Sequence, residues 1–138
     1  LFKLNEARQF NAKVGLGTDI GAGTSFSMLQ TLNEAYKVTK LQGNKLSAVE
    51  GYYLATLGSA RALSLENKIG SLKAGNEADF IVLDPESTPL MKFRMQYATD
   101  WQEKLFVMMT LGDDRSVQST YVAGRLVHDR DANDANVK

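Results

Sequence analysis

A single strand–loop–helix unit near the start of the sequence sets the strongest limit on the fold. Residues 13–17 form a short extended run suited to a buried strand, and a glycine-rich loop follows over residues 18–24. Apolar side chains at helical spacing predict a helix from about residue 25 to residue 42, closed by Gly43. Parallel strands need paired neighbours and covered faces, so one such unit cannot complete a sheet. We therefore expect the chain to be cut from a longer one, with the missing strands upstream.

Capping residues mark the starts of two predicted helices. Thr24 or Ser25 can cap the first helix, because a hydroxyl oxygen accepts a backbone N–H that has no partner within the helix. Ser47 and Glu50 match a capping box that opens a second helix, which we expect Gly58 to interrupt. The apolar spacing of residues 1–11 predicts a further helix ahead of both.

The second half of the sequence is predicted to be richer in strands. Residues 78–83 are apolar and rich in β-forming types, which predicts a buried strand, and residues 117–128 predict a hairpin. Residues 89–95 are predicted to be a strand or a loop, whereas residues 101–111 carry the spacing of a helix. The polar residues 131–138 are expected to form a frayed tail.

The composition argues against several classes of protein. Sixteen lysines and arginines balance sixteen aspartates and glutamates, so no net charge favours nucleic acid or an anionic membrane. The absence of cysteine excludes disulfides and thiolate metal ligands, and it fits a reducing cytoplasmic setting. The apolar runs are far too short to cross a bilayer. We expect a soluble cytoplasmic protein.

Asp19 is the main candidate for a functional side chain. It follows the end of the predicted buried strand, which is where barrel enzymes place their catalytic groups. A carboxylate at this point can bind a metal ion or move a proton. The alternative is that Asp19 caps the loop or the following helix, and its position along the chain does not separate the two readings.

The other polar and aromatic candidates favour structural roles. The glycines of the loop do not match a nucleotide-binding pattern, because Ile20 stands where the third glycine would be. His128 is the sole histidine and lacks partners at metal-binding spacing. The segment Asp113, Asp114 and Arg115 is typical of a solvated turn, in which an aspartate caps and the arginine pairs locally. The aromatic side chains expected to serve in packing are those of Tyr52, Tyr53 and Trp101.

Several segments together resemble a known family. Residues 55–63 (ATLGSARAL), residues 69–72 (IGSL) and residues 78–84 (ADFIVLD) resemble the C-terminal signature of metal-dependent amidohydrolases. Residues 14–19 (VGLGTD) resemble the last barrel strand of the same enzymes. Within that superfamily, residues 21–29 and 105–115 are similar to guanine deaminases, and the resemblance runs from residue 1 to about residue 130.

This resemblance implies an α/β fold: the C-terminal part of a distorted (β/α)8 barrel plus part of a small β-sandwich domain. Residues 1–66 would hold the last barrel strand and the following helices, residues 67–130 the sandwich segment with one inserted helix, and residues 131–138 a flexible tail. It further implies a zinc-dependent enzyme that hydrolyses guanine to xanthine and ammonia, and a homodimer in the full-length protein.

In the resembled family, the aspartate at the position of Asp19 is both a metal ligand and a proton carrier. The family's other Zn²⁺ ligands are histidines on earlier strands, and none can be assigned in a chain whose sole histidine is His128. We therefore expect the isolated chain to be inactive. Two alternatives stay open: a related amidohydrolase acting on another ring, and a non-catalytic domain that assembles through exposed sheet edges.

Overall fold

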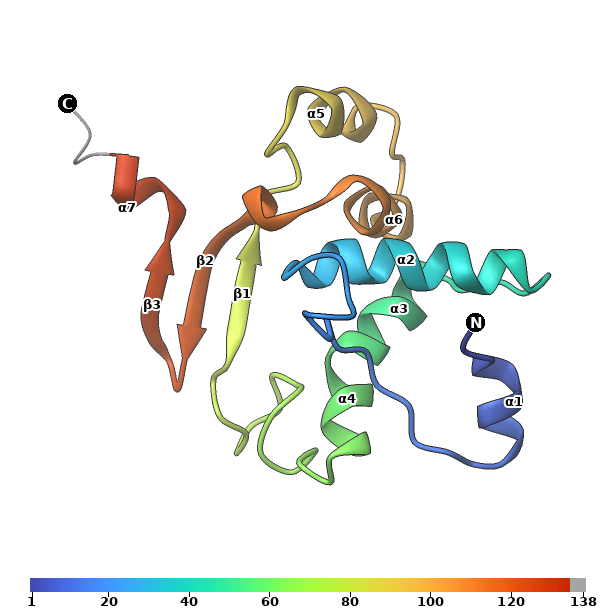
Figure 1. Cartoon of the computed structure of the whole chain (residues 1–138). Coiled ribbons are helices and arrows are strands. Elements are labelled where there is room, and N and C mark those ends of the chain that lie inside the picture. The colour runs from blue at the N-terminus through green and yellow to red at the C-terminus, as the bar shows by residue number, and fades with distance from the viewer. Residues whose placement is uncertain (135–138) are drawn as a thin grey trace.

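The computed structural model describes residues 1–134, and in Figure 1 most of the helices gather on one side, while a small sheet and the last short helix lie on the other. In this part of the chain, no helix is both long enough and apolar enough to cross a bilayer. The elements in chain order are α1 (Leu4–Gln9), α2 (Met28–Leu41), α3 (Ala48–Ala55), α4 (Leu57–Ala62), β1 (Phe80–Leu83), α5 (Pro89–Met95), α6 (Trp101–Leu111), the 3-10 turn η1 (Asp114–Ser116), β2 (Val117–Val122), β3 (Arg125–Asp129) and α7 (Arg130–Asp134).

Helices α2, α3 and α6 enclose the main apolar core. Its buried residues include Leu29 and Leu32 of α2, Ala48 of α3 and Met109 of α6. Gly51 lets α3 approach the other two helices, because a Cβ atom there would lie 3.1 Å from both the Leu32 side chain and the Met109 sulfur. The predicted helices over residues 25–42 and 101–111 thus meet through their apolar faces.

A second apolar cluster joins α1 to α3. Leu4, Leu46 and Leu54 are buried in it. Leu16, from the extended segment that precedes α2, packs against this cluster and also against the main core. The segment is therefore held between the two groups of apolar side chains.

The three strands form one antiparallel sheet in the order β1-β2-β3. Phe80 of β1 lies opposite Tyr121 of β2, and their rings stack with centroids 4.5 Å apart. The predicted hairpin is confirmed: Ala123 and Gly124 join β2 to β3 with φ of 49° and 74°, the left-handed backbone that tight hairpin turns require. Leu83, at the end of β1, packs against the main helical core and links the sheet to it.

Residues 13–17 are extended but form no strand, which corrects one sequence prediction. A strand is defined by its pairing, and no strand pairs with this segment among residues 1–134. The segment instead contacts helical residues, and the backbone N–H of Leu16 donates to the Leu54 carbonyl at 3.0 Å.

Two helix starts also differ from prediction. Helix α2 begins at Met28 and is capped by Ser27, whose side chain accepts from the Gln30 backbone N–H, while Ser25 accepts from the Ser27 backbone N–H. Ser47 caps α3 as expected, accepting from the Glu50 N–H at 3.2 Å. The break after α3 falls at Thr56, not at Gly58, which lies inside α4.

Residues 89–95 form helix α5, so the prediction of a strand or a loop there is wrong. The Thr88 side chain accepts from the Met91 N–H at 3.2 Å, and Pro89 occupies the first turn, where its missing N–H costs nothing. Buried Met91 and Met95 lie one helical turn apart. A segment of seven residues shows too few periods to distinguish this spacing from a strand by sequence alone.

The segment expected to be a frayed tail begins with a short helix. Helix α7 covers Arg130–Asp134, and the remainder of the expected tail, residues 135–138, lies outside the described residues. The Arg130 guanidinium donates to Asp84 at 3.1 Å and to the Arg115 carbonyl at 2.8 Å. These contacts tie the start of α7 to the sheet.

We predict that Leu32→Ala lowers the free energy of unfolding by about 2–5 kcal/mol, because Leu32 is 1% exposed and its loss leaves a cavity between three helices. Leu41→Ala, at the 77%-exposed end of the same helix, is the matched control and should change it by less than about 0.5 kcal/mol. Urea unfolding measures both variants. Equal losses would contradict this account of the core.

Candidate active site

Asp19 lies on the loop between the extended segment and α2. Its φ is 46°, in the left-handed region that Asp tolerates better than most residues. Its carbonyl oxygen accepts from the backbone N–H groups of Ala22 at 3.1 Å and Gly23 at 2.6 Å. A Cβ atom at Gly23 would overlap the carbonyl oxygen of Thr18, so this tight loop requires glycine there. The backbone of Asp19 is thus fixed by its own loop.

The carboxylate of Asp19 is exposed and forms no hydrogen bond or ion pair with other residues in the 1–134 range. The capping role that the sequence left open belongs instead to Ser27, which accepts from the first turn of α2. Only the backbone carbonyl of Asp19 serves the loop. Its side chain is therefore available to a ligand.

Two cavities meet at Asp19. The larger, of about 510 Å³, is lined mainly by apolar groups such as Val14, Ala35 and Leu46, and the smaller, of about 330 Å³, is lined by the glycine-rich loop. Glu34 borders both cavities, but its carboxylate pairs with the Lys37 ammonium at 2.9 Å. Asp19 is the carboxylate at this place that has no such partner among the described residues.

The Asp19 carboxylate suits one ligand position of a metal ion. A carboxylate oxygen is an accepted zinc ligand, and that of Asp19 has no competing protein partner within residues 1–134. A catalytic zinc normally takes three protein ligands, and no group of three histidine, cysteine, aspartate or glutamate residues gathers anywhere in the described part. The residues present therefore fit a partial metal site.

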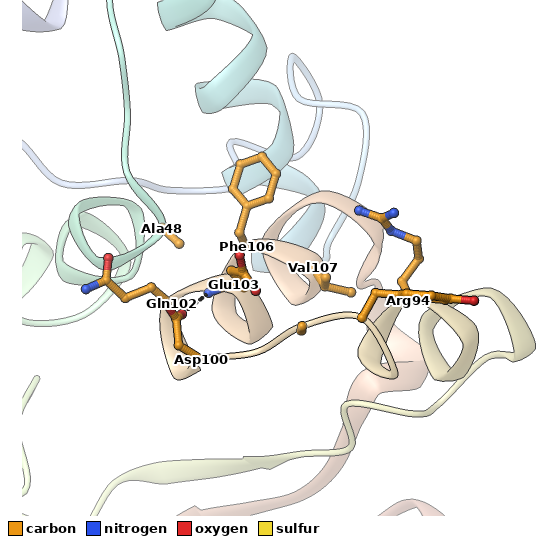
Figure 2. Close-up of a pocket in the computed structure, with 9 residues that line it drawn as sticks. Ala48, Arg94, Asp100, Gln102, Glu103, Phe106 and Val107 are labelled. Carbon is orange, nitrogen blue, oxygen red and sulfur yellow. Dashed lines mark hydrogen bonds between the residues drawn. The ribbon is translucent and has the colours of Figure 1, made fainter.

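A third cavity, away from Asp19, is less suited to catalysis. It has a volume of about 500 Å³ and lies between α5, α6 and the start of α3 (Figure 2). Its two carboxylates serve the start of α6: Asp100 accepts from the Glu103 N–H at 2.9 Å, and Glu103 accepts from the Thr99 N–H at 2.7 Å. Both acidic groups are thus engaged in local structure.

Asp113 and Arg115 form a local ion pair, as the sequence predicts. The guanidinium Nη2 lies 2.6 Å from one Asp113 oxygen, and the other oxygen accepts from the Arg115 backbone N–H at 3.0 Å. Hydrogen bonding from Arg115 lowers the pKa of the Asp113 carboxyl below its ordinary value. The expected solvated turn fits these contacts. His128 is exposed on β3, opposite Thr120.

The aromatic candidates differ in their surroundings. Tyr52 packs against the main core, where burial raises the pKa of its phenol, and its hydroxyl has no partner among the described residues. The Tyr53 hydroxyl accepts from the Arg61 guanidinium at 3.0 Å. Trp101 is 58% exposed, so the prediction that it packs in a core is wrong for the described part of the chain. Trp101 is the first residue of α6, whose buried residues are Val107 and Met109.

Comparison with known proteins identifies the family. The sequence model of the Amidohydrolase family matches residues 1–127. The chain belongs to the amidohydrolase family. It is similar to the guanine deaminase of Escherichia coli (strain K12), with 60% identity over 130 residues that cover 94% of this chain and 30% of that protein. It is also similar to the guanine deaminase of Homo sapiens, with 34% identity over 131 residues that cover 88% of this chain and 29% of that protein.

Similarity extends to other deaminases and to solved structures. The 5-methylthioadenosine/S-adenosylhomocysteine deaminase of Symbiobacterium thermophilum is 33% identical over 129 residues, covering 88% of this chain and 27% of that protein. The structure of E. coli guanine deaminase superimposes with a TM-score of 0.92 at 60% identity, over 94% of this chain and 30% of that one. That of guanine deaminase from Bradyrhizobium japonicum gives 0.86 at 31% identity, over 94% and 34%. The chain spans about three tenths of the length of these relatives.

We predict that Asp113→Asn lowers the melting temperature at neutral pH, because Asn can still cap η1 but cannot pair with Arg115. A lowered pKa in the folded state means that the ion pair stabilises the fold at neutral pH and that this stabilisation is lost as the pH falls through that pKa. The difference in melting temperature between wild type and variant should therefore shrink in strong acid. The prediction would be contradicted if thermal scans gave the same difference in melting temperature at neutral pH and in strong acid.

Proposed function

We propose that this chain forms the C-terminal part of a guanine deaminase, which hydrolyses guanine to xanthine and ammonia. The carboxylate of Asp19 carries the proposal, because it lies where two cavities meet and has no partner among residues 1–134. The 60% identity to E. coli guanine deaminase over 94% of this chain supports guanine as the substrate.

Asp19 would act as a metal ligand and as a proton carrier. Zinc, when bound, would lower the pKa of a bound water molecule toward neutrality and so supply hydroxide at neutral pH. The Asp19 carboxylate would orient the attacking water toward C2 of guanine and accept its proton. It then delivers the proton to the departing amine, which leaves as ammonia. One carboxylate thus serves first as a base and later as an acid.

The remaining zinc ligands would come from outside this chain. Asp19 offers one ligand, and the described residues contain no group of three potential ligands. The relatives are about three times as long as the matched region, which leaves ample sequence for histidine ligands. The last strand of a barrel would then be the extended segment 13–17, paired by strands that the described residues do not contain.

The alternative is that the enzyme deaminates a ring other than guanine by the same hydrolytic chemistry. The similarity to a 5-methylthioadenosine/S-adenosylhomocysteine deaminase, at 33% identity, favours it. The position of Asp19 suits water activation against either ring, because the chemistry of hydrolytic deamination is shared. Comparing the release of ammonia from guanine, adenosine derivatives and cytosine by the whole enzyme separates these substrates.

We predict that Asp19→Asn lowers kcat in the whole enzyme by about 10²- to 10⁴-fold, because the variant cannot accept a proton. Asn also adopts left-handed backbone readily, so the melting temperature should stay close to that of the wild type. Glu34→Gln is the matched control: this carboxylate borders the same cavities but already pairs with Lys37, so its loss should leave most turnover intact. Wild-type turnover in the Asp19→Asn enzyme would disprove the proposed role.

We predict that this chain by itself binds zinc weakly and does not convert guanine. A polypeptide that includes the rest of the barrel should bind zinc tightly and convert guanine to xanthine. The reason is the single ligand that Asp19 offers where three are normally needed. Metal analysis and the absorbance change from guanine to xanthine measure the two properties in parallel. One tightly bound zinc per isolated chain, together with turnover, would show that the ligand set was wrongly assigned.

A further inference from the structure

We propose that Ser59 is a positioning residue for Asp19, an inference that rests on the proposed function of that carboxylate. Ser59 lies in α4, 43 residues along the chain from Leu16, and its hydroxyl joins α4 to the extended segment that leads to Asp19. The same hydroxyl also contacts the Leu54 carbonyl in the last turn of α3. Its contacts serve to hold the two elements together.

The Ser59 hydroxyl lies at the centre of a small hydrogen-bond network. Its Oγ accepts from the backbone N–H of Leu16 at 3.1 Å. It also lies within donor distance of two carbonyl oxygens, 3.1 Å from that of Leu16 and 2.7 Å from that of Leu54. A hydroxyl has one proton and two lone pairs, so this one can donate and accept at the same time. The hydroxyl thus accepts from the Leu16 N–H, while its one proton is shared between the carbonyls of Leu54 and Leu16, of which that of Leu54 is nearer.

Gly15 makes this close contact possible. A Cβ atom at Gly15 would lie 2.5 Å from Ser59 Oγ and 2.6 Å from Ser59 Cα. Both distances are too short for real atoms, and the second involves backbone that cannot rotate away. The glycine and the serine are therefore matched, because the small residue lets the segment approach the helix closely enough to reach the hydroxyl.

The network reaches Asp19 through the backbone. Leu16 is three residues before Asp19, and on the other side the Asp19 carbonyl is held by Ala22 and Gly23. The aspartate is thus anchored from both directions while its carboxylate has no protein partner among residues 1–134. Removing the Ser59 hydroxyl weakens the upstream anchor, which then rests on the bond from the Leu16 N–H to the Leu54 carbonyl. A shift of about 1 Å in a catalytic group can cost about 10²-fold in rate.

The test is Ser59→Ala in the whole zinc-loaded enzyme. Alanine is a good helix former, so α4 should persist. We expect kcat to fall about tenfold with KM within about twofold, as for a misplaced catalytic group rather than a lost binding contact. Amide hydrogen exchange at Leu16, measured by mass spectrometry, should accelerate because one of its two acceptors is gone and only the Leu54 carbonyl, at 3.0 Å, remains.

Thr110→Ala is the matched control. The Thr110 hydroxyl bonds to the Phe106 carbonyl at 2.8 Å within its own helix, so its loss removes a hydroxyl and a hydrogen bond without touching the segment before Asp19. It should leave kcat near the wild-type value. A fall in kcat as large as that of Ser59→Ala would mean that Ser59 acts only through general stability, which overturns the inference.

The outcomes separate this inference from the proposed function. Wild-type kcat in Ser59→Ala beside a large loss in Asp19→Asn would overturn the role of Ser59 and leave that of Asp19 intact. Wild-type turnover in Asp19→Asn would overturn the proposed function itself. If the Ser59→Ala enzyme does not fold, exchange in the wild type decides the matter: rapid exchange at the Leu16 amide would show that the network does not hold the segment.

Discussion

The attachment of the extended segment to helix α4 is the interaction on which the site depends. Leu16 packs between the two apolar clusters, and its backbone bonds to Ser59 and Leu54. An extended segment without a pairing strand has unsatisfied backbone groups, which are costly to bury. In the described residues, helix-borne acceptors and donors take the place that neighbouring strands fill in a sheet. The loop bearing Asp19 therefore starts from a fixed point.

The residues that pack the core are distinct from the candidate catalytic residue. Helices α2, α3 and α6 bury the main core, and the sheet joins this core through Leu83 at the end of β1. None of these packing residues needs to react. Asp19 lies on a loop with strained backbone and an exposed carboxylate, an arrangement found where a site is kept ready for a ligand at some cost to stability. Under the proposed function that cost has a chemical reason, because Asp19 would bind the metal ion and carry the proton.

Sequence reasoning succeeded where local signals are strong and failed where they are short. The helix ending at Gly112 and the hairpin at Gly124 follow from spacing and turn chemistry that act within a few residues. Helix α5 has only seven residues, too few for its period to be recognised. Ser25 and Ser27 are chemically equivalent caps, and only the path of the chain decides between them. Asp19 is a candidate because it follows an extended run, although that run is not a strand in the described residues.

The sequence by itself determined the long helices, the hairpin and the choice of Asp19 as the candidate, because each depends on residues close together in the chain. It also carried the resemblance to the amidohydrolases. Only the tertiary structure decided that the Asp19 carboxylate is left unpartnered in residues 1–134 and that Ser59 bonds to Leu16. The physical reason is distance along the chain: the serine and the segment it holds are 43 residues apart, and their contact exists only where helix packing and a glycine bring the two backbones together.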